Sequence, residues 1–138
     1  MEWYRTYYSF LWRYIKGRIM APHEFMEMAR SKLPKSESDD LIEIRQNSLS
    51  RICLSDEVLW KYWRKFTSDY PTYWHCWYEG KARDQRLNYY GITIILNEDI
   101  PAFVHVLNRC LQEREVVNLK RFVKRVYRSG NDIVHMGI

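Results

Sequence analysis

The segment that most constrains the fold runs from residue 116 to residue 128. Apolar side chains recur there every three or four positions, which predicts a helix with one buried face. The apolar set is Val116, Leu119, Phe122, Val123, Val126 and Tyr127, and Gly130 is expected to end the helix. Cations fill the opposite side. The chain must therefore supply other elements to cover the apolar face, while a strongly basic face meets solvent.

Helical spacing also recurs before residue 70. Residues 3–19 combine aromatic side chains with cations and predict an amphipathic helix, and residues 22–33 and 41–52 predict two more helices. Ser55 precedes two acids and the apolar pattern of residues 58–66, which is typical of an N-cap and a first helical turn. The N-terminal half is thus expected to be helical.

The pattern changes after Pro71. Residues 73–78 and 87–96 are rich in aromatic and β-branched residues, with a turn-like stretch between them, which predicts two antiparallel strands. Asn97 to Asp99 then offers a helix start, and Pro101 suits a first helical turn. A helix is expected to follow and to lead into the basic helix.

The length of 138 residues suits one domain, and no composition shift marks a boundary. We expect a single α+β domain over residues 1–138, mainly helical, with a small antiparallel sheet of two or three strands. The expected parts are an amphipathic helix in 1–20, helices in 21–70, a β-hairpin in 71–97 and C-terminal helices in 98–138.

Charge and aromatic content point to a binding function. The chain carries 22 Lys and Arg against 17 Asp and Glu, and 16% of its residues are aromatic, including 6 Trp. Cations neutralise phosphates, and flat rings stack on unpaired bases. We therefore predict a non-enzymatic protein that binds RNA or another polyanion, within a larger complex or as a small regulatory or viral accessory factor. The predicted contacts are Lys120, Arg121, Lys124, Arg125, Arg128, Trp60, Trp63, Arg64 and Lys65.

A protein partner is the alternative explanation for the aromatic surplus. Trp, Tyr and Arg dominate the binding energy of protein interfaces, so a subunit or inhibitor would use the same residue types. The candidate interface residues are Trp3, Tyr7, Trp12 and Tyr62. Residues 3–19 also suit peripheral contact with an anionic membrane. On either reading, the basic helix would be only a solvated charged face.

An enzymatic hypothesis comes from the C-terminus. Arg128 and His135 are separated by six residues, a spacing that resembles the Arg-x4–6-His motif of HEPN ribonucleases over eight residues. The resemblance implies an all-helical fold in which this pair cleaves RNA without a metal. A metal-independent ribonuclease is therefore a third hypothesis.

The sequence predicts neither a metal site nor a cofactor. His75 and Cys76 are adjacent and would point to opposite faces of a strand, and the glycines are isolated rather than gathered in a phosphate loop. The three cysteines are far apart and odd in number, which favours a reducing compartment. We expect a cytoplasmic protein without a transmembrane segment, with the nucleus or the mitochondrion as alternative locations.

Overall fold

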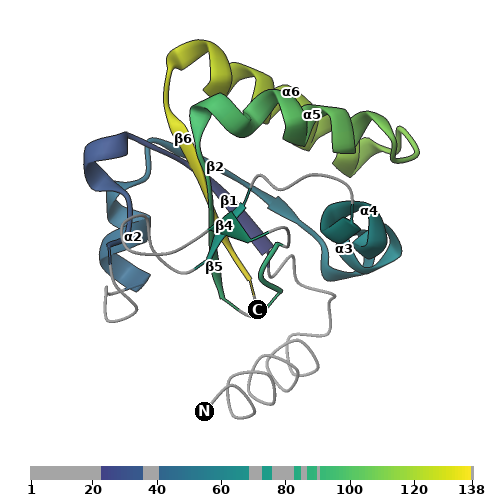
Figure 1. Cartoon of the computed structure of the whole chain (residues 1–138), viewed down its shortest axis with the longest axis horizontal. Coiled ribbons are helices and arrows are strands. Elements are labelled where there is room, and N and C mark those ends of the chain that lie inside the picture. The colour runs from purple at the N-terminus through teal and green to yellow at the C-terminus, as the bar shows by residue number, and fades with distance from the viewer. Residues whose placement is uncertain are drawn as a thin grey trace.

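The computed structural model describes residues 23–35, 41–68, 73–75, 83–84, 87–89 and 91–137. The helix expected in residues 1–20 lies outside these ranges, and so do Trp3, Tyr7 and Trp12. The described residues form an α+β domain in which helices lie against one antiparallel sheet (Figure 1).

Six strands make up this sheet within the described residues, in the order β2-β1-β6-β5-β3-β4. Every neighbouring pair is antiparallel. The C-terminal strand β6 lies between β1 and β5, so the end of the chain is central to the sheet. The strands are β1 His23–Met28, β2 Ser50–Leu54, β3 Tyr73–His75, β4 Arg83–Asp84, β5 Ile92–Ile95 and β6 Asp132–Met136.

Helices connect and cover these strands. The α-helices are α2 Leu41–Asn47, α3 Asp56–Lys61, α4 Trp63–Ser68, α5 Ile100–Asn108 and α6 Arg114–Ser129, and the short 3-10 turns are η1 Arg30–Lys32 and η2 Asn97–Asp99. Figure 1 shows α5 and α6 side by side over one face of the sheet, while α2 lies on the other side.

The central strands are buried on both faces. Phe25 and Ile133 point into the core shared with α5 and α6, and their neighbours Met26 and Val134 point into a second core that includes Ile44 of α2. The register pairs Met26 with Val134, which places the two side chains in one layer. A strand covered on both faces has no polar side to alternate with its apolar side.

The structure corrects the prediction for residues 21–70. Residues 22–33 were expected to form a helix, but β1 occupies His23–Met28. The helix expected over residues 41–52 is shorter, because α2 covers Leu41–Asn47 and β2 begins at Ser50. A short segment that mixes apolar and polar residues fits a strand as well as a helix, and tertiary pairing decides between them. Ser55 caps α3 as predicted, with its Oγ accepting a hydrogen bond from the Val58 amide.

The sheet is also larger than expected. β3 pairs with β5 in antiparallel fashion, as predicted for residues 71–97, but β4 adds a further strand there. The predicted helices in 98–138 are present as α5 and α6, and β6 follows them. The expectation of two or three strands is therefore wrong, because three strands lie outside the predicted hairpin. The description of the chain as mainly helical fits only loosely, since the sheet is a large part of the described fold.

Candidate functional site: the basic face of helix α6

Helix α6 has the amphipathic form that its sequence predicts. Its five buried side chains are Val116, Leu119, Phe122, Val123 and Val126, and they belong to the core between the helices and the sheet. Gly130 ends the helix in the left-handed conformation, with φ of 76°, which a residue with a Cβ adopts only with strain.

The outward face of α6 contains no acid. Glu115 is turned toward α3, where its two carboxylate oxygens accept hydrogen bonds from the Ser55 amide at 2.9 Å and from the Ser55 hydroxyl at 2.7 Å. The exposed positions of the helix are Arg114, Asn118, Arg121, Lys124, Arg125, Tyr127, Arg128 and Ser129. The exposed cations Arg114, Arg121, Lys124, Arg125 and Arg128 are called the basic face below.

Three arginines of the basic face recur at intervals of seven residues. Arg114, Arg121 and Arg128 follow one another along the same side of the helix, about 10.5 Å apart at 1.5 Å per residue. Arg114 lies outside the predicted binding residues, although the same heptad spacing could have identified it. Tyr127 was expected on the buried side and is exposed instead.

The cations of α6 have no carboxylate partners. Arg125 Nη2 donates to the Ser50 hydroxyl at 3.1 Å, and its guanidinium lies 5.4 Å from the centre of the Phe122 ring. Lys120 is half-buried and donates to Gln112 Oε1 at 2.5 Å. Within the described part of the chain, no salt bridge joins any of the six Lys and Arg side chains of α6 to an acid.

The predicted aromatic contacts lie on α3 and α4 rather than on α6. Trp60 is 65% exposed and touches the edge of Tyr89, with ring centres 5.9 Å apart. Trp63 is half-buried and contacts the same ring at 5.2 Å. Arg64 is exposed, and Lys65 donates to the Arg109 carbonyl.

Acidic residues lie between these aromatics and the basic face. The Tyr62 hydroxyl donates to Glu113 at 2.6 Å, and Lys61 Nζ donates to the same carboxylate at 2.9 Å. Glu113 immediately precedes α6, and Glu115 binds Ser55 at the start of α3. The structure therefore does not join the rings of α3 and α4 to the cations of α6 in one continuous surface.

Tyr62 is a core residue rather than an interface residue. It is only 5% exposed and belongs to the main core. Burial raises the pKa of its hydroxyl, and the hydrogen bond to Glu113 raises it further, while that bond lowers the pKa of Glu113. The interface prediction for Tyr62 is wrong, because its hydroxyl finds an acceptor inside the fold.

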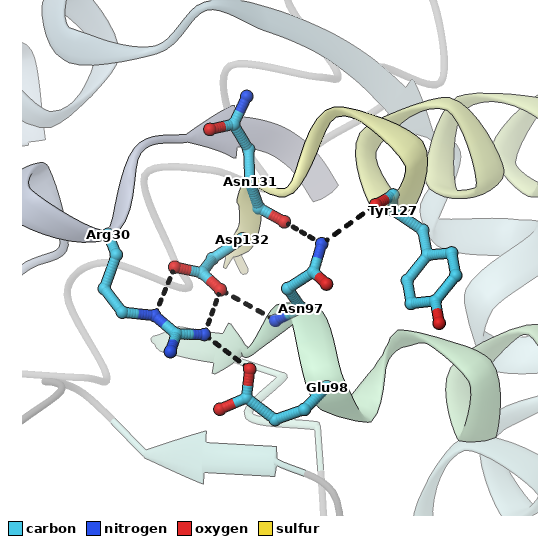
Figure 2. A network of polar contacts seen from close by, with 6 residues as sticks. All are labelled: Arg30, Asn97, Glu98, Tyr127, Asn131 and Asp132. Carbon is cyan, nitrogen blue, oxygen red and sulfur yellow. Dashed lines mark hydrogen bonds and ion pairs between the residues drawn. The ribbon is translucent and has the colours of Figure 1, made fainter.

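A different set of polar residues surrounds Arg30 (Figure 2). Its Nε and Nη2 donate to the two oxygens of Asp132 at 3.1 and 2.8 Å, and Nη2 also donates to Glu98 at 2.6 Å. These carboxylate hydrogen bonds raise the pKa of Arg30, with Asp132 as the larger cause. The buried Asp132 also accepts from the Asn97 amide at 2.7 Å. The two carboxylates neutralise the charge of Arg30, and the network joins η1 to η2 and β6.

The two histidines of the central strands form a buried pair. His23 Nδ1 lies 3.0 Å from His135 Nε2, and His23 Nε2 lies 3.2 Å from Asp56 Oδ1, which also accepts from the Tyr89 hydroxyl. His135 Nδ1 has no hydrogen-bond partner. Burial lowers the pKa of His135 well below its usual range, and nearby His23 lowers it further. The contacts fit neutral rings in which His135 donates to His23 and His23 donates to Asp56.

The positions of Arg128 and His135 argue against the ribonuclease hypothesis. His135 is fully buried in β6, whereas Arg128 is exposed in the last turn of α6. The HEPN motif places its Arg and His on one helix, and here the two residues lie on different elements. The geometry that the resemblance implies is absent.

No three His, Cys, Asp or Glu side chains of the described residues lie close enough together to hold a metal ion. None of the described helices is both long enough and apolar enough to cross a bilayer. The sequence matches no protein-family model, and neither a curated protein nor a solved structure is significantly similar to the chain.

Proposed function

We propose that the protein binds RNA or another polyanion through the basic face of α6. The observation that supports this function is that the six Lys and Arg side chains of the helix have no carboxylate partner among the residues that the structure describes. Like charges gathered on one surface repel one another, and a row of phosphates relieves that repulsion while releasing condensed counterions. An ordinary charged surface has acids interspersed among its cations. The basic face has none, which favours a role in binding.

The basic face predicts the strength of the salt dependence. Five cations that each neutralise one phosphate give a slope of log K against log salt of about −3.5 for single strands and about −4.5 for duplexes. Affinity should therefore fall by about two decades or more between 50 and 200 mM salt. The contact is to the backbone, so little dependence on sequence is expected from α6 alone.

The test is binding of labelled RNA to the purified protein and to the variant Arg121→Gln/Lys124→Gln/Arg128→Gln. A matched control, Lys32→Gln/Lys35→Gln/Arg109→Gln, removes the same charge from exposed positions outside α6. We expect the α6 variant to lose at least 30-fold in affinity at low salt and the control to lose less than threefold. Equal losses of affinity in both variants would mean that binding depends only on the net charge of the protein, which would contradict a site on α6.

A second function is favoured by the exposed Trp60. A large aromatic ring that is 65% exposed beside Tyr89 has the chemistry of an interface anchor. A protein partner held there would bind with little dependence on salt, and Trp60→Ala would weaken it while the α6 variant would not. The salt dependence of binding therefore separates the two functions.

A further inference from the structure

A cavity of about 510 Å³ lies beside the basic face, between the end of α2 and the start of β2. We call it the β2-edge cavity, because β2 is the outermost strand of the sheet on that side. It is open to solvent rather than enclosed, although its volume falls in the range of small-molecule sites. The lining side chains used below are Ile42, Arg45, Gln46, Leu49, Ser50 and Arg51.

The cavity combines apolar walls with polar groups. Ile42 and Leu49 are 63% and 62% exposed and form its apolar part. Gln46 offers an exposed amide, and Arg51 offers an exposed guanidinium that forms no salt bridge among the described residues. Arg45 adds a second guanidinium, which donates to Glu24 at 3.3 Å.

These groups fit an unpaired nucleotide. A nucleobase has two apolar faces that pack on aliphatic or guanidinium surfaces, and a polar edge that an amide can hydrogen-bond. Its phosphate needs a cation, which Arg51 supplies. An apolar ligand alone would make no use of the Arg51 guanidinium, whereas Arg45 is already paired with Glu24.

The cavity is joined to the basic face by direct contacts. Arg125 belongs to the basic face, and its Nη2 donates to the hydroxyl of Ser50 at 3.1 Å. Ser50 donates in turn to Glu27, which also accepts from Asn131 directly after α6. An RNA strand bound along α6 would therefore reach the cavity by crossing the edge of β2.

We propose that the β2-edge cavity holds one unpaired nucleobase of the strand bound to α6, which makes single-stranded RNA the preferred ligand. This inference rests on the proposed function of the basic face. A base within a duplex presents only its edges in the grooves and is stacked on both sides, so it cannot enter the cavity. The basic face alone would bind either form.

The test uses three probes of equal length: single-stranded RNA, the blunt duplex of the same sequence, and a single strand with abasic sites that keeps every phosphate. The protein is compared with Leu49→Asn/Arg51→Gln, whose two side chains are exposed, and with Lys32→Gln as a variant with the same charge loss. Thermal unfolding of each variant checks that the fold is retained.

We expect the protein to prefer the single strand over the abasic strand by about tenfold. The cavity variant should lose this preference while binding the duplex within threefold of the unchanged protein. Equal affinity for the single and abasic strands, unaffected by the cavity variant, would overturn the inference and leave the basic face intact.

Two other results are also decisive. Failure of the protein to bind any of the three probes at low salt would overturn the proposed function itself. The protein could instead bind an extended peptide that alternates Asp and Leu. If the cavity variant lost that binding and kept its RNA binding, the cavity would be a peptide site and the proposal of a nucleobase would be wrong.

Discussion

Arg30 and the cations of α6 show two different uses of positive charge. Arg30 donates three hydrogen bonds to two carboxylates, one of them on the fully buried Asp132 (Figure 2). The arginines of the basic face have no carboxylate partner among the described residues. Cations that hold elements of this fold together are neutralised within it, as Lys61 is by Glu113. Within the described part of the chain, six cations without a carboxylate partner lie on this one helix, which is the reason to assign them to a ligand.

The largest effect is expected from Arg30→Ala. The change leaves the buried carboxylate of Asp132 with only the Asn97 amide as a donor, so stability should fall by about 3 kcal/mol. Urea unfolding measures the loss, and Arg30→Lys should recover part of it. RNA affinity under folding conditions should not change. A loss below 1 kcal/mol would show that Arg30 is as dispensable to the fold as the cations of α6.

His135 is a third case, a buried titratable group whose ring contacts His23 rather than a carboxylate. The folded state lowers the pKa of His135, so the unfolded chain takes up a proton near pH 6.5 that the folded chain does not. Stability should be complete above that pH and fall below it, by up to about 1.4 kcal/mol per pH unit from this group.

His135→Gln tests this dependence, because the Gln amide can still donate to His23 Nδ1 without titrating. Urea unfolding at pH 7, 6 and 5 should show a shallower decline for the variant than for the unchanged protein. An identical decline in both would mean that His135 does not set the acid sensitivity.

A smaller effect is expected from a single cation of the basic face. Arg121→Ala should reduce RNA affinity three- to tenfold at low salt and make the salt slope shallower by about 0.7 for a single strand. Stability should stay within about 0.5 kcal/mol, because the side chain is exposed and forms no salt bridge with any described residue. A stability loss comparable to that of Arg30→Ala would erase the distinction between the two groups of cations.

The smallest effect is expected from Trp60→Ala. Its ring contacts Tyr89, and acids lie between α3 and the basic face, so RNA affinity should change less than twofold. A tenfold loss of RNA affinity would instead support the sequence-based prediction that Trp60 stacks on a base, and would extend the binding surface from α6 to α3.

The success of sequence reasoning differs between α6 and β1 for a physical reason. α6 has one face in the core and one in solvent, so its sequence carries a clear 3.6-residue period and a terminating Gly130. β1 is buried on both faces and carries no such contrast, and its Met and Glu residues are also common in helices.

The polar sites depend on long-range pairing that no local pattern encodes. The register of β1 and β6 brings His23 near His135 across 112 positions of the chain, and Arg30 meets Asp132 across 102. Tyr62 and Trp63 are adjacent in the sequence, which does not show which of them faces the core. In the structure Tyr62 is buried, and Glu113 accepts a hydrogen bond from its hydroxyl. The cations of the basic face were predictable from sequence, whereas their lack of acidic partners was not.

The most direct test of the central claim is the affinity for single-stranded RNA measured from 50 to 200 mM salt. Five phosphate contacts on α6 predict a slope of log K against log salt of about −3.5, reduced to about −1.4 in Arg121→Gln/Lys124→Gln/Arg128→Gln, which keeps two of the five cations. A slope near zero, or the same slope in the protein and the variant, would contradict the assignment of the basic face to a polyanion.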